Sequence, residues 1–420
     1  MFSIRAHHNP YLRRDQHIMQ AVLSLQLDDT VQLTPAPLAL AIALDQSASM
    51  SGPKMRAARD GAIKVIEALD ENILFLIVPF NDTSNVLFGP ALGTPGNKRK
   101  ATSALQRIDA SYGTCMSKAL DTIVTCLESE QARACKILFL TDGKNEGEPR
   151  ARLDAAIERC RAANMSVSAW GVGTDWDAAE LRHMADATHG SADIIPHPQQ
   201  IASAFTASFQ EMRKTAIPHA RLGLWCPAGV TITHIQQVYP NIVACTSEPD
   251  ATNPRQVLVS LGSFAAGEQR DYLLDLEIPV HEPGMQFLMA RPSVLYLLAG
   301  GSEQVQKSTQ EGWVFVQWTD NLQLAAQIED HIAHYTNQEA LSRNLKEGQE
   351  ALVAGDVARA TKLLGDALIQ SEQSGNDKIT RLLSNLVLRD AKGTIRLNTQ
   401  ADAVARKTLA INVGQTTKLK

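Results

Sequence analysis

The feature that most constrains the fold is an alternation of continuous apolar runs with helical stretches between residues 38 and 212. The apolar runs are 38–44, 73–78, 137–140, 167–172 and 194–195. A strand that is apolar throughout is buried on both faces, as in a parallel sheet that helices cover on each side. The alternation predicts an α/β domain with a doubly wound, mostly parallel sheet, in which ligands bind at the carboxyl ends of the strands.

The segments on either side of this domain have different patterns. Strand-like alternation precedes it, and after it come short apolar runs between Pro, Gly and Asn, typical of an antiparallel β-sandwich. A helical region and a polar, basic end complete the chain. We expect five parts: N-terminal strands (1–35) that join the sandwich, the α/β domain (36–213), the β-sandwich (214–320), a helical hairpin region (321–388) and a flexible tail (389–420).

Charge and hydropathy exclude several classes of protein. The chain has 40 Lys and Arg against 45 Asp and Glu, a net charge of −5, which argues against nucleic acid as the main partner. No segment approaches the roughly 18 apolar residues of a membrane span. The basic N-terminus has no apolar run behind it, so we expect no secretory signal and a cytoplasmic location. The six cysteines form no C-x-x-C pair, so we expect reduced thiols.

Oxygen-bearing side chains follow the ends of two predicted strands and open a helix. Asp45, Ser47 and Ser49 come directly after the first apolar strand, Thr114 precedes a helix, and Asp142 ends the strand at 137–140. In a doubly wound sheet these three loops lie at one edge, so we expect their side chains to converge.

This all-oxygen set favours a hard cation, with Mg²⁺ first and Mn²⁺ or Ca²⁺ as alternatives. Hydroxyls are neutral ligands and leave the cation much of its positive charge. The side chains do not complete the usual six ligands, so an open position should attract a carboxylate from outside. Helix N-termini nearby also favour an incoming anion.

The pattern Asp45-x-Ser47-x-Ser49, Thr114 and Thr141-Asp142-Gly143 resembles the metal-ion-dependent adhesion site of von Willebrand factor type A domains, over about residues 38–212. The resemblance implies that Ser47, Ser49 and Thr114 touch the metal, and that Asp45 and Asp142 act directly or through water. It implies that an Asp or Glu of a partner protein supplies the sixth ligand. Family members commonly have Asn after the Thr, where this chain has Cys115.

The resemblance also implies a non-enzymatic, metal-dependent protein-binding module without catalytic residues. The order of its parts is similar to bacterial cytoplasmic proteins of this type, which often act beside AAA+ ATPases or Ser/Thr kinase and phosphatase systems. A hydrolase is the enzymatic alternative, but the site offers no general base beyond the ligands. Two histidine pairs, His183 with His189 and His331 with His334, supply too few ligands for zinc, so we expect solvated side chains.

Three threonines near the C-terminus each precede an apolar residue by three positions: Thr394, Thr408 and Thr416. This spacing resembles targets of forkhead-associated domains, which bind phosphothreonine and the third residue after it. A phosphate would add charge and acceptors for a receptor's arginines. An adaptor role in a kinase–phosphatase signalling system, through a phosphorylated tail, is therefore an alternative function, and coincidence in a Thr-rich segment is the other explanation.

Overall fold

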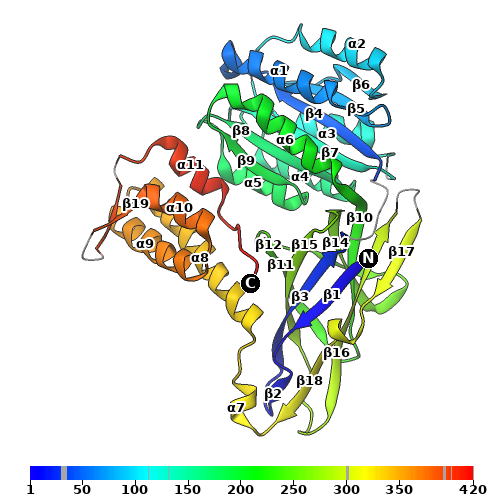
Figure 1. Ribbon diagram of the computed structural model, residues 1–420, viewed down its shortest axis with the longest axis vertical. Coiled ribbons are helices and arrows are strands. Elements are labelled where there is room, and N and C mark those ends of the chain that lie inside the picture. The colour runs from blue at the N-terminus through cyan, green and yellow to red at the C-terminus, as the bar shows by residue number, and fades with distance from the viewer. Residues whose placement is uncertain are drawn as a thin grey trace.

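The computed structural model describes residues 1–29, 36–111, 113–130, 132–298, 302–390, 394–398 and 400–419. It shows an α/β domain stacked on a β-sandwich, with a C-terminal helical region beside both (Figure 1). This confirms the predicted fold class of a mostly parallel sheet combined with antiparallel sheets and C-terminal helices. The predicted boundary at residue 35 lies outside the described residues.

The α/β domain has a six-stranded sheet in the order β6-β5-β4-β7-β8-β9, in which only β6 runs antiparallel to its neighbour. Its strands are β4 (Leu38–Asp45), β5 (Leu74–Phe80), β6 (Phe88–Leu92), β7 (Ala134–Thr141), β8 (Met165–Val172) and β9 (Ser191–Ile195). Every residue of β4 is buried, as its apolar sequence requires. The chain order reverses between β4 and β7, so their carboxyl ends form the crevice where such sheets bind ligands.

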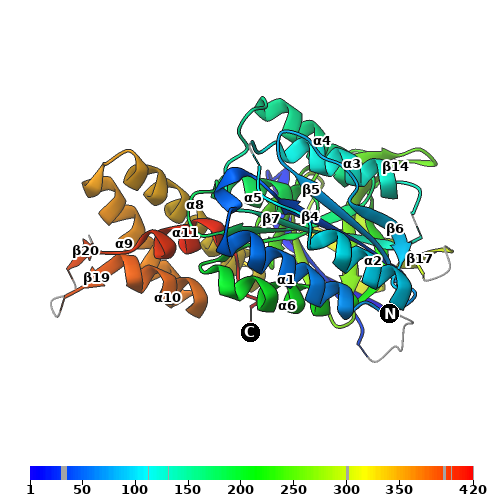
Figure 2. The same cartoon turned by 90° about the horizontal axis from the view of Figure 1, so that it is seen from above.

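Helices cover both faces of this sheet (Figure 2). On one face α1 packs against α6 and α2, and on the other α3 packs against α4, with α5 beside it. The helices are α1 (Pro53–Glu67), α2 (Pro95–Leu105), α3 (Met116–Leu127), α4 (Arg150–Ala162), α5 (Ala178–Ala187) and α6 (Ile201–Arg213). The two apolar layers hold the strand ends in fixed positions.

The β-sandwich combines strands from before and after the α/β domain. One sheet has the order β1-β3-β15-β11-β12, and the other β13-β14-β10-β16-β18-β2, with β17 paired to β16. Its strands are β1 (Phe2–His7), β2 (Tyr11–Arg13), β3 (Ile18–Leu27), β10 (Thr215–Trp225), β11 (Thr231–Tyr239), β12 (Val243–Ala244), β13 (Ser247–Asp250), β14 (Asn253–Ala265), β15 (Gln269–Glu277), β16 (Gln286–Leu297), β17 (Glu303–Lys307) and β18 (Val314–Thr319). The α/β domain is therefore inserted between β3 and β10.

The helical region begins with a long antiparallel pair, α8 and α9, joined at Gly355, whose φ of +77° suits glycine. Its elements are α7 (Leu322–Ala325), α8 (Asp330–Val353), α9 (Val357–Gln373), α10 (Asp377–Leu386), β19 (Val387–Arg389), β20 (Ile395–Leu397) and α11 (Ala403–Ile411). Tyr335 of α8 packs on Val22 and Leu273 of the sandwich. None of the described helices has the length and apolar character needed to cross a membrane.

The expectation of a flexible tail after residue 389 is wrong for the described part of that segment. α11 packs against α5 and β9 of the α/β domain. Arg182 Nη1 of α5 donates to the carbonyl oxygen of Ala410 at 3.0 Å, and the Thr416 amide donates to the carbonyl oxygen of Pro240 at 2.9 Å. The physical reason is burial of apolar side chains: Leu409 and Ile411 of α11 are buried in two different cores, which the polar composition of the segment does not indicate.

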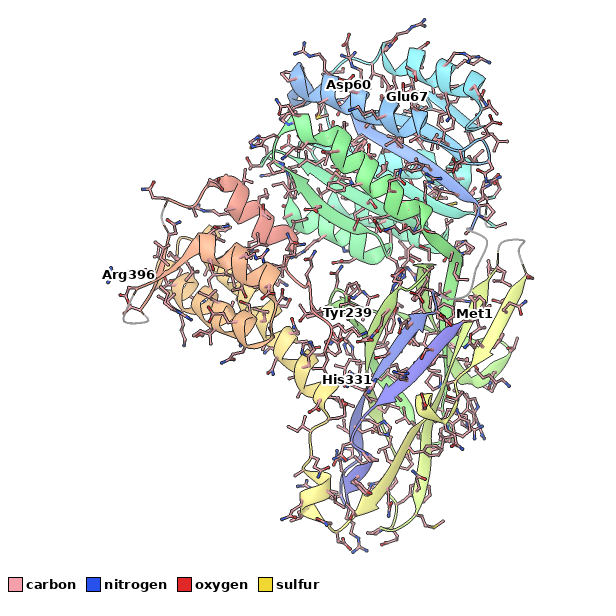
Figure 3. The ribbon with its side chains drawn as sticks, viewed as in Figure 1. Met1, Asp60, Glu67, Tyr239, His331 and Arg396 are labelled. Atoms are coloured by element: carbon pink, nitrogen blue, oxygen red, sulfur yellow. The ribbon has the colours of Figure 1, made fainter. Side chains whose placement is uncertain are left out.

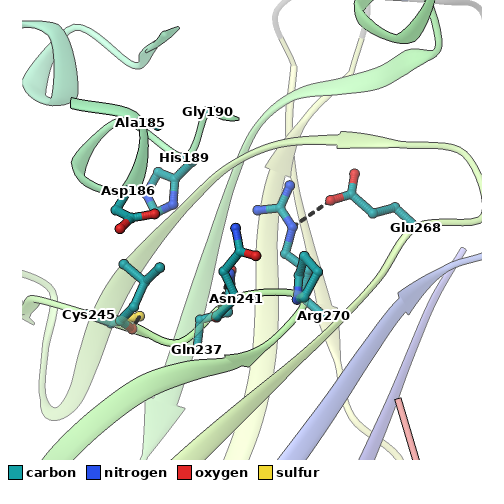
Figure 4. Close-up of a pocket in the computed structure, with 11 residues that line it drawn as sticks. Ala185, Asp186, His189, Gly190, Gln237, Asn241, Cys245, Glu268 and Arg270 are labelled. Atoms are coloured by element: carbon teal, nitrogen blue, oxygen red, sulfur yellow. Dashed lines mark hydrogen bonds and ion pairs between the residues drawn. The ribbon is translucent and has the colours of Figure 1, made fainter. Parts of the chain in front are cut away.

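The α/β domain meets the sandwich at His189, which is partly buried rather than solvated as we expected. His189 has a φ of +52°, and it approaches Gly262 of β14 so closely that a Cβ there would lie 2.8 Å from the His189 Cβ. A cavity of about 100 Å³ beside it is lined by Asp186 and Arg270, among others (Figure 4). Burial, reinforced by the positive charge of Arg270, lowers the pKa of His189 to about 3.

This burial predicts acid sensitivity that His189→Asn should remove, since Asn also tolerates positive φ. Above pH 6.5 the imidazole is neutral in the folded and the unfolded state and does not affect stability. As pH falls from 6.5 towards 3, the unfolded state binds a proton that the folded state does not, so stability falls. From pH 7 to pH 5 the wild type should lose about 2 kcal/mol of unfolding free energy relative to His189→Asn. Burial raises the pKa of Asp186 to about 6, an opposite contribution that both proteins share. Denaturant titrations that give parallel pH curves would contradict the prediction.

Candidate metal centre

The first predicted loop turns sharply after β4. Asp45 is fully buried at the strand end, and its Oδ1 accepts a hydrogen bond from the Ser47 amide at 2.7 Å. A short 3₁₀ turn, Ala48–Met50, follows and buries Met50 beneath the loop. Gly52, with a φ of +75°, then redirects the chain into α1, which begins with Pro53. The turn fixes the backbone from which both serines of the loop project.

The second loop, after β7, meets the first through direct hydrogen bonds. Thr141 Oγ1 donates to Asp45 Oδ2 at 2.6 Å. Ser49 Oγ donates to Asp142 Oδ1 at 2.7 Å, and the Ser47 and Ser49 hydroxyls lie 3.0 Å apart. Asp142 is fully buried, whereas Ser49 is exposed. The carboxylates of this group are therefore enclosed by protein, whereas its Ser49 side is open to solvent.

Thr114, the predicted ligand in the loop before α3, lies next to the loops after β4 and β7. A Cβ placed on Gly143 would lie 3.7 Å from Thr114 Oγ1 and 3.9 Å from Ser49 Oγ, so both hydroxyls border the open space beside Gly143. The Thr114 carbonyl oxygen accepts from the Glu146 amide at 3.0 Å, which ties this loop to the one after β7. The structure thus brings together all five predicted residues: Asp45, Ser47, Ser49, Thr114 and Asp142.

The loop after β7 also holds the start of α3, where Cys115 makes no side-chain cap. Asn145 Oδ1 accepts from the Met116 amide at 3.0 Å, and Glu148 accepts from both the amide and the hydroxyl of Ser117. These residues fix Thr114 from a loop far away in the sequence. Their role as caps was not visible in the sequence, because a cap supplied by another loop leaves no local pattern.

The electrostatics of this centre favour a cation. Burial raises the pKa of Asp45 to about 6, and the neighbouring Asp142 charge adds to the increase, against hydrogen bonds from Thr141 and Ser47. A bound cation would stabilise the ionised form of Asp45. One positive group already lies here: Lys54 Nζ of α1 is 2.5 Å from Asp142 Oδ2. Carboxylates, neutral hydroxyls and an open side fit a hard divalent ion.

Lys54 was missed by the sequence analysis, and it should oppose metal binding. Its ammonium group neutralises the same Asp142 carboxylate that a divalent cation would use, and it repels that cation. Since its side chain is 27% exposed, it can swing into solvent, which limits the repulsion. We expect Lys54→Met to bind Mg²⁺ about tenfold more tightly by calorimetry, roughly 1.4 kcal/mol. Lys64→Met, an exposed lysine of the same helix, is the control, and unchanged or weaker binding in Lys54→Met would contradict this role.

The three threonines proposed as phosphosites lie in different surroundings. Thr394 is exposed, next to β20. Thr408 Oγ1 donates to the carbonyl oxygen of Val404 within α11 at 2.7 Å, and Thr416 Oγ1 donates to the carbonyl oxygen of Val238 at 2.6 Å. The last two would have to leave folded positions to enter a kinase or a phosphothreonine-binding domain.

Comparisons with known proteins agree with this architecture. The structure is similar over 100% of its length to a von Willebrand factor type A protein from Catenulispora acidiphila, with 97% of that chain covered, 26% identity and a TM-score of 0.91. The ArnB paralog VWA2 from Sulfolobus acidocaldarius shares the fold, with a TM-score of 0.66, 14% identity and coverage of 99% and 98%.

Among curated proteins, an uncharacterized protein of Synechocystis is 24% identical over 256 residues, which is 60% of this chain and 60% of that protein. The match therefore spans about three fifths of that relative. Residues 38–194 match the family model of the von Willebrand factor type A domain, the segment that holds every residue of the candidate metal centre. The chain therefore contains a von Willebrand factor type A domain, joined here to a β-sandwich and a helical region.

Proposed function

We propose that this protein is a metal-dependent protein-binding module, in which a divalent cation at Asp45, Ser47, Ser49, Thr114 and Asp142 is completed by an acidic side chain of a partner. Von Willebrand factor type A domains generally mediate adhesion and protein–protein interaction. The observation that supports metal dependence in this chain is the convergence of three hydroxyls and two carboxylates from three separate loops.

The mechanism that we propose is a bridge through the ion. The buried carboxylates of Asp45 and Asp142 would supply the negative charge that holds the cation, and the hydroxyls would bind it without cancelling its charge. The exposed side of the site, at Ser49, leaves a coordination position for a carboxylate from another protein. A charge-assisted contact of this kind adds both strength and geometric selection to an interface.

We propose no catalytic role for the site. Its acidic and hydroxyl groups hydrogen-bond to one another, and Lys54 pairs with Asp142, so these residues form a ligand set rather than a nucleophile with a base. The pathway is also a proposal: an AAA+ ATPase or a Ser/Thr kinase–phosphatase system with a forkhead-associated protein would supply the partner. Thr394 is the one predicted phosphosite whose exposure favours the second of these.

An affinity capture from lysate of the native host tests the bridge. The full chain should retain a specific partner with Mg²⁺ and release it with EDTA, because the ion is the contact. Asp142→Ala and Ser47→Ala should each lose the partner while their circular dichroism stays unchanged. The control Asp60→Ala on α1 (Figure 3) removes an exposed carboxylate outside the site and should retain it. A partner that is held equally in EDTA and by both site variants would overturn the proposal.

A further inference from the structure

A second group of metal-ligating side chains lies far from the von Willebrand factor type A domain, where the helical region meets the sandwich. His7 ends β1, and Glu329 and His331 lie at the start of α8. One ligand atom from each of the three lies within 4.8 Å of the others, and all three side chains are partly buried. Figure 3 labels His331 at this junction, beside the N-terminal strands.

Strand alternation explains how His7 reaches α8. Phe2 and Ile4 of β1 point into the sandwich core, whereas Arg5 is exposed on the outer face of the sheet. His7, two residues further along the strand, therefore lies on the same outer face as Arg5. α8 packs on that outer face through Tyr335, whose hydroxyl donates to Asp271 of β15. The start of α8 is therefore held on the sandwich at this point by packing that does not involve the histidines.

The geometry of Glu329 prepares it as a ligand. As the N-cap of α8, its Oε2 accepts from the amides of His331 at 2.8 Å and Ile332 at 3.2 Å. The other oxygen, Oε1, lies 2.8 Å from His331 Nδ1 and 3.9 Å from His7 Nδ1. One carboxylate oxygen is thus fixed by the helix, and the other is presented to two imidazole nitrogens.

The two imidazoles lie against each other at this junction, and the neutral imidazole is the form that binds metals. Their rings stack with centroids 3.6 Å apart and planes inclined by 20°, so two protonated rings would repel each other strongly.

We propose that His7, Glu329 and His331 bind a transition-metal ion that connects β1 to the start of α8. Zn²⁺ is the first candidate for this ion. Two imidazoles and one carboxylate are a ligand set that Zn²⁺ takes in proteins, with water in a fourth position. A metal ion lies in the plane of each imidazole that binds it, so the stacked rings of His7 and His331 would have to rotate apart for both to face one ion. The ion links β1 to the start of α8 and stabilises the docking of the helical region on the sandwich.

This site also revises the interpretation of His331 and His334 as a solvated pair. His334 contacts the carbonyl oxygen of Thr417 through Nε2 at 2.7 Å, so it does not share the ligand set of His331. The third ligand, His7, lies more than 300 residues away in the sequence, and no sequence spacing could have connected it to α8.

Zinc titration of the untagged, chelator-stripped full chain in excess Mg²⁺, which occupies the other centre, tests the proposal. We expect one tightly bound Zn²⁺, a raised thermal midpoint, and visible absorption of a four-coordinate ion when Co²⁺ replaces it. His7→Gln and His331→Gln should each weaken Zn²⁺ binding by at least about tenfold, since even second-shell losses cost 10–100-fold. His17→Gln, an exposed histidine, should bind like the wild type.

X-ray absorption of the wild-type zinc complex keeps the test independent of how the variants fold. Two imidazoles with oxygen ligands support the site, whereas sulfur ligation would assign the ion to cysteines elsewhere and overturn it. Zinc binding that is absent, or equal in the two histidine variants and the control, would leave Glu329 and His331 as a helix cap alone and would also overturn it. None of these outcomes depends on the Mg²⁺-dependent partner proposed above.

Discussion

Asp142→Ala is expected to abolish Mg²⁺ binding in the concentration range where the wild type saturates. Asp142 is the carboxylate on which the site converges: Ser49 donates to one of its oxygens and Lys54 to the other. Its removal takes away a negative ligand and the acceptor that orients Ser49, so we expect affinity to fall by at least about 100-fold. Isothermal titration calorimetry measures the change directly.

Two further variants separate charge from shape. Asp142→Asn keeps an acceptor for Ser49 but removes the charge, so it should bind Mg²⁺ almost as weakly as Asp142→Ala. Asp60→Ala removes an exposed aspartate of α1 and should bind like the wild type. Because Asp142 lies just beyond β7, the sheet should survive, and the circular dichroism of all three variants should agree. Wild-type affinity in Asp142→Ala would exclude this carboxylate from the site.

Shortening either of the two buried side chains of α11, Leu409 or Ile411, is expected to produce the largest loss of stability at the C-terminal end of the chain. Leu409 is fully buried in the core of the helical region, and Ile411 is buried in the core of the α/β domain, beside α5. Leu409→Ala and Ile411→Ala should each lower the free energy of unfolding by about 2–5 kcal/mol, the range for buried large-to-small changes. Because the two residues enter different cores, α11 fastens the helical region to the α/β domain.

Hydrogen exchange distinguishes the two contacts. Ile411→Ala should increase exchange in α5 and β9, whereas Leu409→Ala should increase it in α9 and α10. Val353→Ala is the control, since that side chain is 91% exposed and should change stability by less than about 0.5 kcal/mol. If both α11 variants behaved like Val353→Ala, the C-terminal segment would be the flexible tail that its composition suggested. A deletion of this segment is therefore a poor test of phosphothreonine binding, because it would also remove buried contacts.

The α/β domain was predictable because its central strands contain continuous apolar runs. Residues 38–44 of β4 and 137–140 of β7 show this most clearly, since they are apolar and buried on both faces of the sheet. The metal-ligating candidates were predictable for a related reason: once the parallel order of these strands is known, residues after their ends must meet at one edge. β6 was not predicted, since its Phe88–Leu92 sequence contains Gly and Pro and reads as a break.

What could not be predicted depends on contacts between distant segments. Lys54 looks like any lysine in the first turn of a helix, and only the position of β7 places Asp142 beside it. His189 was expected in solvent, but the sandwich covers it, and nothing near His189 in sequence indicates that. The same holds for His7, whose partners in α8 follow from the packing of the helical region on the sandwich. Local sequence patterns determine elements, whereas the placement of one element on another depends on the whole chain.

The central claim, that the loops after β4 and β7 and before α3 hold a divalent ion, is tested most directly by crystals of the protein grown with Mn²⁺. Anomalous scattering should show one ion between the hydroxyls of Ser47, Ser49 and Thr114 and the Asp142 carboxylate, with Lys54 moved away from Asp142. A saturating Mn²⁺ concentration that leaves no anomalous peak there, with Lys54 still paired to Asp142, would contradict the claim.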